Sequence, residues 1–470
     1  MKKVRYQFLT LLGAGSLLAS SLFAGQADYP EVVQHDESAL AQWWNGKYAT
    51  GNWFGLRDTL ADRGLTFQGT YKANFLGIVS GGLQQRFGYD DEFRFGVNLD
   101  VAKLTGWEAV KGLSFSSTVR YRGGAGINKY SGASGTFAPT AFQSGRLWRF
   151  LSVYATYTTP ELFGAKEFLT ISGGWQNPSD FFLVQPESKF FLNNAISTTK
   201  GISPNGSPWG GSYAAWGGYI KVKPLEWYYA QAGLYLAMPY GTDTANHGLA
   251  FQGYHPDPNA NGLYFLAETG FTPKIGPAKL PGRYSAGFLY WGLENTSFFG
   301  ATYDQKVQFY FQADQQVYRE PSPVVESPVY AKGPTDGKGV YKQVEEPEQV
   351  LSNQGLYAFN LVNFAPKYNN VLPFYFQTGL VYKGLIPTRD NDQFGVAFAL
   401  GNYSYYKILS EYNSGIGVHQ TYEGVVEIDY RFQINKWAYI QPNFQYIIRP
   451  GGTGLVQNDA ILGFQVGVNF

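Results

Sequence analysis

Apolar and polar residues alternate along the end of the chain. One parity of residues 460–470 is apolar throughout: Ala460, Leu462, Phe464, Val466, Val468 and Phe470. The other parity carries small or polar residues such as Gln465 and Asn469. A period of two predicts a β-strand with one apolar face. About ten such residues are typical of a strand that crosses an outer membrane, with the apolar side toward lipid.

The same alternation recurs from residue 65 to the end. Phe93, Phe95 and Val97, for example, oppose Glu92 and Arg94. The pattern predicts strands near 65–79, 92–104, 111–122, 147–158, 166–175, 210–223, 225–239, 261–273, 281–293, 303–318, 353–364, 372–384, 392–405, 419–434, 436–449 and 459–470. The segment 353–364 alternates least clearly. About sixteen strands, an even number, predict an all-β fold, a transmembrane antiparallel β-barrel.

The connections between these strands differ in length. If both ends of the barrel face the periplasm, three long stretches become extracellular loops: 123–146, 176–209 and 240–260. The short segments 223–225 and 434–436 become periplasmic turns. The long, proline-containing segment 319–352 falls on the periplasmic side. Either one strand is miscounted or this segment is a genuine excursion, and we favour the excursion.

The chain divides into three parts. Residues 1–27 have a basic start and a short apolar stretch, and they predict a secretory signal peptide cleaved near Ala24 or Ala27, rather than a retained anchor. Residues 28–64 form an N-terminal segment. We expect a short amphipathic helix in it, with Leu56, Leu60 and Ala61 on one face, Asn52 as a cap at its start and Gly64 as a C-cap. The alternative is an irregular loop. Residues 65–470 form the barrel.

Composition supports a barrel and excludes other classes. Aromatic residues make up 18% of the chain and charged residues only 15%, while the mean hydropathy is −0.23. After the start of the chain no apolar run approaches the length of a membrane helix. The formal charge of +1 gives no reason to expect nucleic acid as a partner. There is no cysteine, so disulfides and thiol chemistry are excluded.

No catalytic or metal-binding pattern stands out. The four histidines are His35, His247, His255 and His419, and their spacing is not that of metal ligands. The sequence has no nucleophile elbow and no phosphate-binding loop. We therefore expect neither an enzyme nor a cofactor or metal.

A channel lumen remains as the candidate site. By strand parity the inward charged residues are Glu92, Arg94, Asp100, Arg120, Arg122, Lys221, Glu268, Asp314, Glu423, Glu427, Asp429 and Arg431. Both signs are interspersed, which suits a neutral polyol better than an ion, because single-sign rings select ions. The alternative is that these charges pair across the wall and only keep the lumen wet.

A barrel of about sixteen strands leaves an aqueous channel, so something must narrow it. The stretches 123–146 and 176–209 are long enough to fold inward. The second carries five large aromatic residues that could pack on the inner wall: Phe181, Phe182, Phe190, Phe191 and Trp209. Ordinary packing of these rings within the loop is the alternative.

Four segments, in order, resemble one known family. They are 53–65 (WFGLRDTLADRGL), 310–319 (YFQADQQVYR), 379–392 (GLVYKGLIPTRDND) and 422–452, which includes QPNFQYII and PGG. Together they resemble the carbohydrate-selective outer-membrane porins of OprB type. The resemblance implies a sixteen-stranded barrel for passive uptake of sugars and an eyelet of arginine, acidic and aromatic side chains. The terminal Phe470 is similar to the assembly signal by which the barrel assembly machinery recognises outer-membrane barrels.

The sequence thus predicts a passive porin for small neutral sugars in the outer membrane of a Gram-negative-type bacterium, as a monomer or trimer. Glu92, Arg94 and Arg120 are the preferred solute contacts. A general or weakly anion-selective porin is the first alternative. A secreted all-β carbohydrate-binding protein is the second, although we find none of the repeats of 40–50 residues that such a solenoid or propeller needs.

Overall fold

The computed structural model describes residues 38–143, 148–198, 200–205, 214–237, 262–321 and 352–470. The chain separates into two compact units, residues 1–42 and 43–470, and the barrel belongs to the second. The predicted signal peptide, the stretch 240–260, Trp209, His35, His247 and His255 lie outside the described residues, as does most of the segment 319–352.

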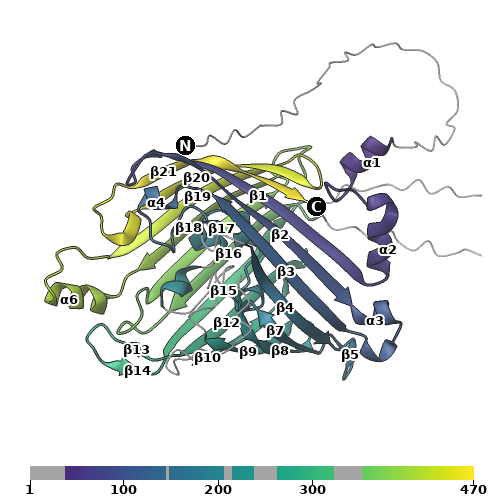
Figure 1. Cartoon of the computed structure of the whole chain (residues 1–470), viewed down its shortest axis with the longest axis horizontal. Helices are drawn as coiled ribbons and strands as arrows, with labels where there is room; N and C mark the ends of the chain where they lie inside the picture. The colour runs from purple at the N-terminus through teal and green to yellow at the C-terminus, as the bar shows by residue number, and fades with distance from the viewer. Residues whose placement is uncertain (1–37, 144–147, 199, 206–213, 238–261, 322–351) are drawn as a thin grey trace, which may run out of the picture. The chain divides into compact units, whose positions relative to one another are not determined.

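Sixteen long strands of the described chain form one closed antiparallel barrel (Figure 1). They are β1 (Leu65–Ser80), β2 (Phe87–Asp100), β3 (Leu113–Gly124), β4 (Arg149–Thr158), β7 (Leu169–Gln176), β8 (Ala215–Leu225), β9 (Tyr228–Ala237), β10 (Gly262–Phe271), β12 (Leu280–Gly292), β15 (Lys306–Arg319), β16 (Gly355–Phe364), β17 (Phe374–Lys383), β18 (Gln393–Asn402), β19 (Tyr422–Gln433), β20 (Ala438–Ile448) and β21 (Asp459–Asn469). The predicted strands all have counterparts, including the weakest, which is β16.

The remaining elements are short. The minor strands are β5 (Glu161–Leu162), β6 (Ala165–Lys166), β11 (Lys274–Ile275), β13 (Asn295–Thr296) and β14 (Thr302–Tyr303). The helices are α1 (Ala39–Asn45), η1 (Trp53–Gly55), α2 (Leu56–Asp62), α3 (Val101–Thr105), η2 (Glu108–Val110), α4 (Asn128–Ser131), η3 (Pro178–Asp180), η4 (Glu187–Phe190), α5 (Asn194–Ser197), η5 (Lys200–Asn205), α6 (Tyr405–Asn413) and η7 (Pro450–Gly452). Among the described residues, no helix has the length and apolarity needed to cross a membrane.

The barrel closes where its first and last strands meet. β1 and β21 pair antiparallel, with Thr70 opposite Asn469. The N–H of Phe470 donates to the carbonyl of Gly69 at 2.8 Å and extends this seam by one residue. The sixteen described strands of the barrel are therefore left without an unpaired edge, which a membrane-embedded sheet requires.

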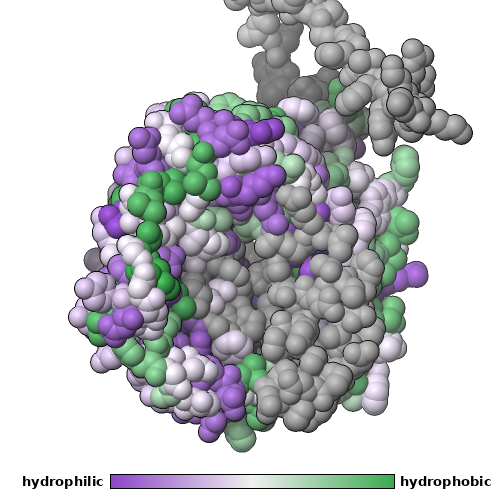
Figure 2. Space-filling model, turned by 60° about the vertical axis from the view of Figure 1, so that its left-hand side comes forward, coloured by the Kyte–Doolittle hydropathy of each residue, from purple (hydrophilic) through white to green (hydrophobic). Residues whose placement is uncertain are grey.

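Strand parity separates the two faces of the wall. On β15, Phe309 and Phe311 are exposed on the outside, whereas Gln308 and Gln312 are buried inside. The alternation therefore places apolar side chains outside and polar ones inside, as in outer-membrane barrels. This is the reverse of the arrangement in a soluble protein. Figure 2 looks onto the end that carries α6, where hydrophilic side chains gather beside hydrophobic ones on the rim and the face is hollowed between them.

Connections at the end of the barrel that holds Leu65 and Asn469 are mostly tight. β8 and β9 are joined through Glu226 and Trp227, and β19 and β20 through residues 434–437. The strand order places the long connection between β15 and β16 at this same end, as the count of strands predicts. That this end faces the periplasm stays a prediction.

The predicted N-terminal helix is present as α2, but it docks by a different residue. Leu56 is exposed, whereas Leu60 and Ala61 are half-buried, so the predicted apolar face is covered only in part. The buried residue is Arg57, whose Nη2 donates to the carbonyls of Phe67 and Phe470, each at 2.9 Å. The Asn52 side chain accepts the N–H of Asp58 at 3.3 Å, although Gly55 is the N-cap. Gly64 follows the helix at φ +89°, a conformation that favours glycine.

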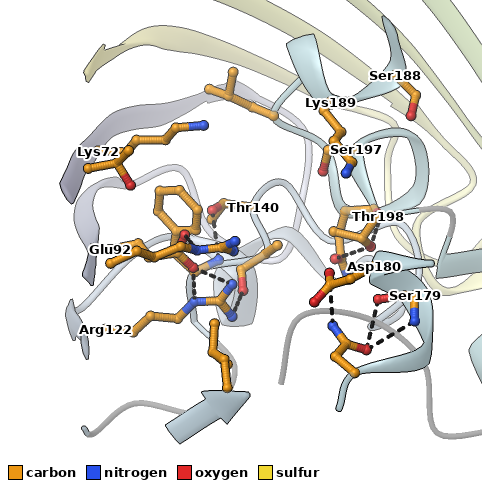
Figure 3. Close-up of a pocket in the computed structure, with 18 of the residues that line it drawn as sticks. Lys72, Glu92, Arg122, Thr140, Ser179, Asp180, Ser188, Lys189, Ser197 and Thr198 are labelled. Carbon is orange, nitrogen blue, oxygen red and sulfur yellow. Dashed lines mark hydrogen bonds and ion pairs between the residues drawn. The ribbon is translucent and has the colours of Figure 1, made fainter. Parts of the chain in front are cut away.

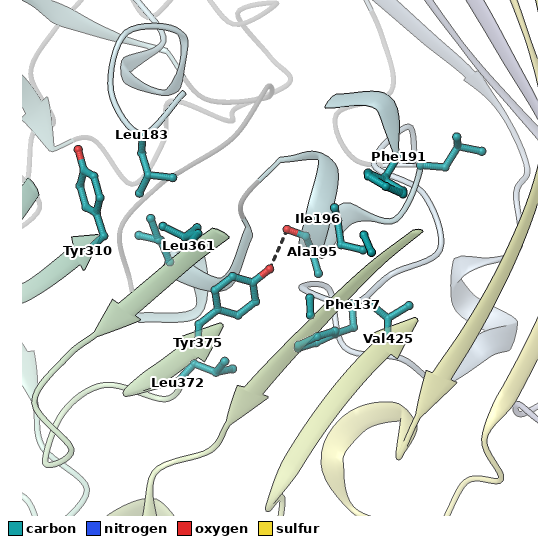
Figure 4. Close-up of a cluster of buried hydrophobic side chains, with 14 of the residues drawn as sticks. Phe137, Leu183, Phe191, Ala195, Ile196, Tyr310, Leu361, Leu372, Tyr375 and Val425 are labelled. Carbon is teal, nitrogen blue, oxygen red and sulfur yellow. Dashed lines mark hydrogen bonds between the residues drawn. The ribbon is translucent and has the colours of Figure 1, made fainter. Parts of the chain in front are cut away.

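Two long connections fold into the lumen and fill part of it. The β3–β4 loop (residues 125–148) and the β7–β8 loop (residues 177–214, described to Asn205 except Thr199) bring apolar side chains onto the inner wall. The buried contacts join Phe137, Phe191, Ala195 and Ile196 of the loops to Leu361, Tyr375 and Val425 of the strands (Figure 4). The Tyr375 hydroxyl donates to the Ala195 carbonyl at 3.0 Å. The inward folding of both stretches is thus confirmed.

Candidate functional site

The open part of the lumen is a cavity of about 520 Å³ between two surfaces. Strands β1, β2, β3, β4 and β21, with part of the β3–β4 loop, form one surface, whose strands present alternate residues such as Gln68, Thr70 and Gln465. The β7–β8 loop forms the other surface, with η3, η4 and α5. Figure 3 shows the side chains of both surfaces pointing into this space. We call it the constriction cavity.

A carboxylate surrounded by arginines forms the strand side of the constriction cavity. Glu92 lies directly opposite Arg122 in the register of β2 and β3, and Arg94 lies opposite Arg120. Glu92 Oε1 accepts from Arg94 Nε at 2.5 Å, and Glu92 Oε2 accepts from Arg122 Nε at 2.6 Å. Arg120 Nη1 lies 3.9 Å from the same carboxylate. Four residues predicted from parity are therefore brought together, and Glu92, Arg94 and Arg122 line the cavity.

Three charged lining residues were missed by the sequence reasoning. Lys72 lies on β1, and Asp180 and Lys189 lie on the β7–β8 loop. The parity of β1 could have found Lys72, because it shares a face with Thr70 and Asn74. No periodic signal marks Asp180 or Lys189, since neither lies in a strand.

Electrostatics couple the two loop residues to the wall. Burial raises the pKa of the Asp180 carboxyl, while Arg94 and Lys189 act in the opposite direction. Burial lowers the pKa of the Lys189 ammonium, Asp180 opposes this, and Arg94 and Lys72 lower the pKa further. The lining therefore brings charges of both signs close enough to interact across the cavity, with hydroxyls of Ser188, Ser197 and Thr198 nearby.

Other predicted lumen charges hold the loops instead of lining the constriction cavity. Glu427 accepts the backbone N–H groups of Leu192 at 2.7 Å and Asn193 at 3.1 Å. Glu423 accepts those of Ser134 at 3.0 Å and Gly451 at 2.8 Å. These acidic side chains supply acceptors for loop backbone that is removed from water.

Arg431 and the additional charges named by parity also bind protein groups. The Arg431 guanidinium donates to Gln441 Oε1 at 2.8 Å and lies 4.9 Å from the centre of the Phe190 ring. Glu268 accepts the Leu183 N–H at 2.9 Å, and Asp429 accepts from Gln441 at 3.0 Å. The Lys221 ammonium lies 4.7 Å from the Tyr229 ring centre.

Asp100 and Asp314 differ from the sequence expectation. Asp100 ends β2, and its carboxylate accepts the Lys103 N–H at 3.1 Å, so it caps α3 and does not line the constriction cavity. A strand-terminal aspartate that precedes a helix is a preferred N-cap, which parity alone does not reveal. Asp314 is buried opposite Arg283 on β12, and neither of its oxygens has a hydrogen-bond partner among the described residues.

The described residues offer little other chemistry. His419 Nδ1 lies 3.6 Å from Glu411, which also pairs with Lys407 on α6. Within the described ranges no three histidine, aspartate or glutamate side chains gather into a metal site. The constriction cavity is therefore the candidate functional site.

A closed barrel with an apolar outside and a polar opening narrowed by its own loops defines a channel-forming outer-membrane protein. Comparison with known proteins specifies the class. A family model described as the carbohydrate-selective porin, OprB family, matches residues 84–470. The chain therefore belongs to this family, and its place is the outer membrane of a Gram-negative bacterium.

Individual relatives agree with this assignment. Porin B of Pseudomonas aeruginosa is 26% identical over 448 residues, which cover 90% of this chain and 91% of the relative. A putative porin QuiX of Acinetobacter baylyi is 22% identical over 451 residues, which cover 90% and 93%. The high-pH structure of Pseudomonas putida OprB has a TM-score of 0.75 at 22% identity, covering 91% of this chain and 99% of that one. These likenesses confirm the predicted family and fold, and the chain is a sugar porin rather than a secreted binding protein.

Proposed function

We propose that this porin lets small neutral mono- and oligosaccharides diffuse passively through the constriction cavity, and that it acts as a channel rather than an enzyme. The observation that carries the proposal is the lining: charges of both signs and hydroxyls surround a space of about 520 Å³. That volume lies within the range in which protein pockets hold small molecules. Donors and acceptors placed together suit a polyol, which offers both on each hydroxyl.

Arg94 and Glu92 are the proposed solute contacts on the wall, with Arg122 beside them. The side chain of Arg94 is 42% exposed, so it reaches into the cavity while Glu92 holds its guanidinium. Arg120 is fully buried behind this pair. We assign it a positioning role, because its charge supports the geometry of Glu92 without facing the cavity. Contacts of this kind are weak enough for solute to leave quickly, which diffusion through a pore requires.

The chain ends are proposed to serve targeting and assembly. Residues 1–27 would act as a signal peptide, and Phe470 would be read by the barrel assembly machinery. The contacts of Phe470 with Gly69 and Arg57 support a role for this residue in sealing the barrel. Assembly into a monomer or a trimer stays open, and no nucleic acid partner is expected.

Swelling of proteoliposomes in mono-, di-, tri- and pentasaccharides tests the proposed function. We expect rapid swelling in monosaccharides and a steady fall with sugar length, because the cavity limits solute size. The variant Arg94→Gln should weaken the reduction of single-channel current by glucose about tenfold in half-saturating concentration, the worth of one hydrogen bond to a charged group. Lys223→Gln is the matched control, because Lys223 on β8 is half-buried, pairs with Glu167 at 3.9 Å and does not line the cavity. No swelling in any sugar would refute the proposal.

A further inference from the structure

The constriction cavity carries more positive than negative charge. Four cations line it, namely Lys72, Arg94, Arg122 and Lys189, against the two carboxylates Glu92 and Asp180. Glu92 is already bound to Arg94 and Arg122. A low-dielectric cavity with excess charge of one sign concentrates solutes of the opposite sign.

Unlike Arg94 and Arg122, the two lysines have no carboxylate partner among the described residues. Among the described residues, neither the Lys72 nor the Lys189 ammonium makes a side-chain hydrogen bond or an ion pair within 4.0 Å. Lys72 lies on the strand wall and Lys189 on the loop, on opposite sides of the cavity (Figure 3). Lys189 is exposed and Lys72 is half-buried, so a solute in the cavity can reach both ammonium groups.

Hydroxyl groups lie on the same side of the cavity as Lys189. Ser188 precedes it in η4, and Ser197 and Thr198 come from the end of α5 (Figure 3). Each hydroxyl already donates to a backbone carbonyl of the loop, at 2.9 Å for Ser188, 2.8 Å for Ser197 and 2.7 Å for Thr198, and its oxygen can still accept a hydrogen bond from a solute hydroxyl. A solute that presents one negative group and several hydroxyls would therefore match this part of the cavity better than a neutral sugar or a bare anion.

We propose that the constriction cavity contains a subsite for sugar acids, in which the carboxylate of an aldonic or uronic acid lies between Lys72 and Lys189 and its hydroxyls meet the serine and threonine side chains. The subsite takes a singly charged solute, because Asp180 lies near Lys189 and opposes a second negative charge. This inference rests on the proposed function, since it uses the same cavity as the sugar pathway.

Uptake of radiolabelled gluconate and glucose into proteoliposomes tests the inference, with potassium and valinomycin on both sides to hold the membrane potential at zero. The measured quantity is the ratio of the two initial rates. Lys72→Gln and Lys189→Gln should each lower the gluconate-to-glucose ratio roughly fivefold, the factor that one ion contact at 4 Å contributes in water. The double variant should lower it further, and Asp180→Asn should raise it.

Lys223→Gln is the control, because it removes a lysine outside the cavity and should leave the ratio unchanged. Glucose uptake reports a folded, open channel in every variant. An unchanged ratio in the double variant, with normal glucose uptake, would overturn the sugar-acid subsite and leave the sugar pathway intact. Absence of glucose uptake in the unmodified protein would instead refute the proposed function. Faster uptake of glucose 6-phosphate than of gluconate, lost in the double variant, would overturn the assignment to a carboxylate.

Discussion

Two parts of the inner wall carry the same kinds of side chain but use them differently. On β2 and β3, Glu92 and its arginines face the open constriction cavity. On β19, Glu427 is fully buried and accepts backbone N–H groups of the β7–β8 loop. Both glutamates point inward by strand parity. The difference is that a loop covers one wall and leaves the other exposed to solute.

Loop coverage therefore decides the role of an inward charge. A loop folded inside a barrel removes backbone donors from water, and each must find an acceptor. Glu427 meets that need on the covered wall, and the apolar side chains of Phe191 and Ile196 complete the contact. On the open wall, Glu92 accepts no loop backbone N–H among the described residues, and it instead holds two guanidinium groups, of which that of Arg94 is open to a solute and that of Arg122 is buried.

The largest effect is expected from the substitution Glu427→Ala, on the wall that the β7–β8 loop covers. The substitution removes the acceptor of the Leu192 and Asn193 N–H groups and one of the two acceptors of the Asn443 amide, which we expect to cost roughly 5 kcal/mol of loop docking. The loop should then leave the wall and widen the pore. Single-channel conductance should rise, and longer oligosaccharides should enter proteoliposomes.

Glu427→Gln is the matched control, because it keeps the oxygen that accepts from all three donors. It should retain conductance and size exclusion close to the unmodified values. If Glu427→Ala leaves both quantities unchanged, the loop is held by its other contacts, and the distinction between the two walls fails.

A smaller effect is expected from Glu92→Gln on the open wall. The change leaves the buried Arg122 without its carboxylate beside two other guanidinium groups, which should destabilise the barrel by about 3 kcal/mol. The midpoint of urea unfolding in lipid vesicles measures this loss. The cavity should also become more anion-selective, because one negative charge is removed.

Glu108→Gln tests whether burial causes that loss. Glu108 pairs with Lys111 at 3.7 Å, but both side chains are largely exposed. Exposed pairs contribute little, so the unfolding midpoint should not move. Equal shifts for both variants would show that the Glu92 cluster behaves as an ordinary surface ion pair.

Strand positions and side-chain direction could be predicted from the sequence, because both follow from the local period of two. Even the weak segment 353–364 forms a strand, β16, and Gln465 faces the cavity as its parity requires. The inward folding of two loops followed from their length and aromatic content. These features depend on short stretches of sequence.

The sequence did not predict whether an inward charged side chain binds a loop or faces the cavity, because this depends on contacts between distant segments. Ser134 binds Glu423 and Leu192 binds Glu427 across more than two hundred residues of sequence. Asp180 and Lys189 line the cavity only because their loop folds back. The burial of Arg57 on α2 could not be predicted for a related reason, since its guanidinium donates to Phe470, from the far end of the chain.

The smallest expected effect is a pH dependence confined to the open cavity. Burial raises the pKa of the Asp180 carboxyl, so it loses its charge at a higher pH than the usual value of about 3.9. As pH falls from 7, neutral Asp180 leaves the lining cations less opposed, and the anion-to-cation permeability ratio should rise roughly twofold. Burial lowers the pKa of the Lys189 ammonium below the usual lysine value of about 10.4. Lys189 therefore loses its charge in the alkaline range, and the anion-to-cation permeability ratio should fall there.

Reversal potentials in a potassium chloride gradient between pH 4 and 10 measure both steps. Asp180→Asn should remove the acid step and hold the ratio at its low-pH value, whereas Lys189→Gln should remove the alkaline step. Glu427→Gln should keep both steps, because its carboxylate is covered by the loop and does not face permeating ions. The comparison would be contradicted if the rise of the permeability ratio at acid pH survived Asp180→Asn but disappeared in Glu427→Gln. The titrating carboxyl would then lie on the wall that the loop covers.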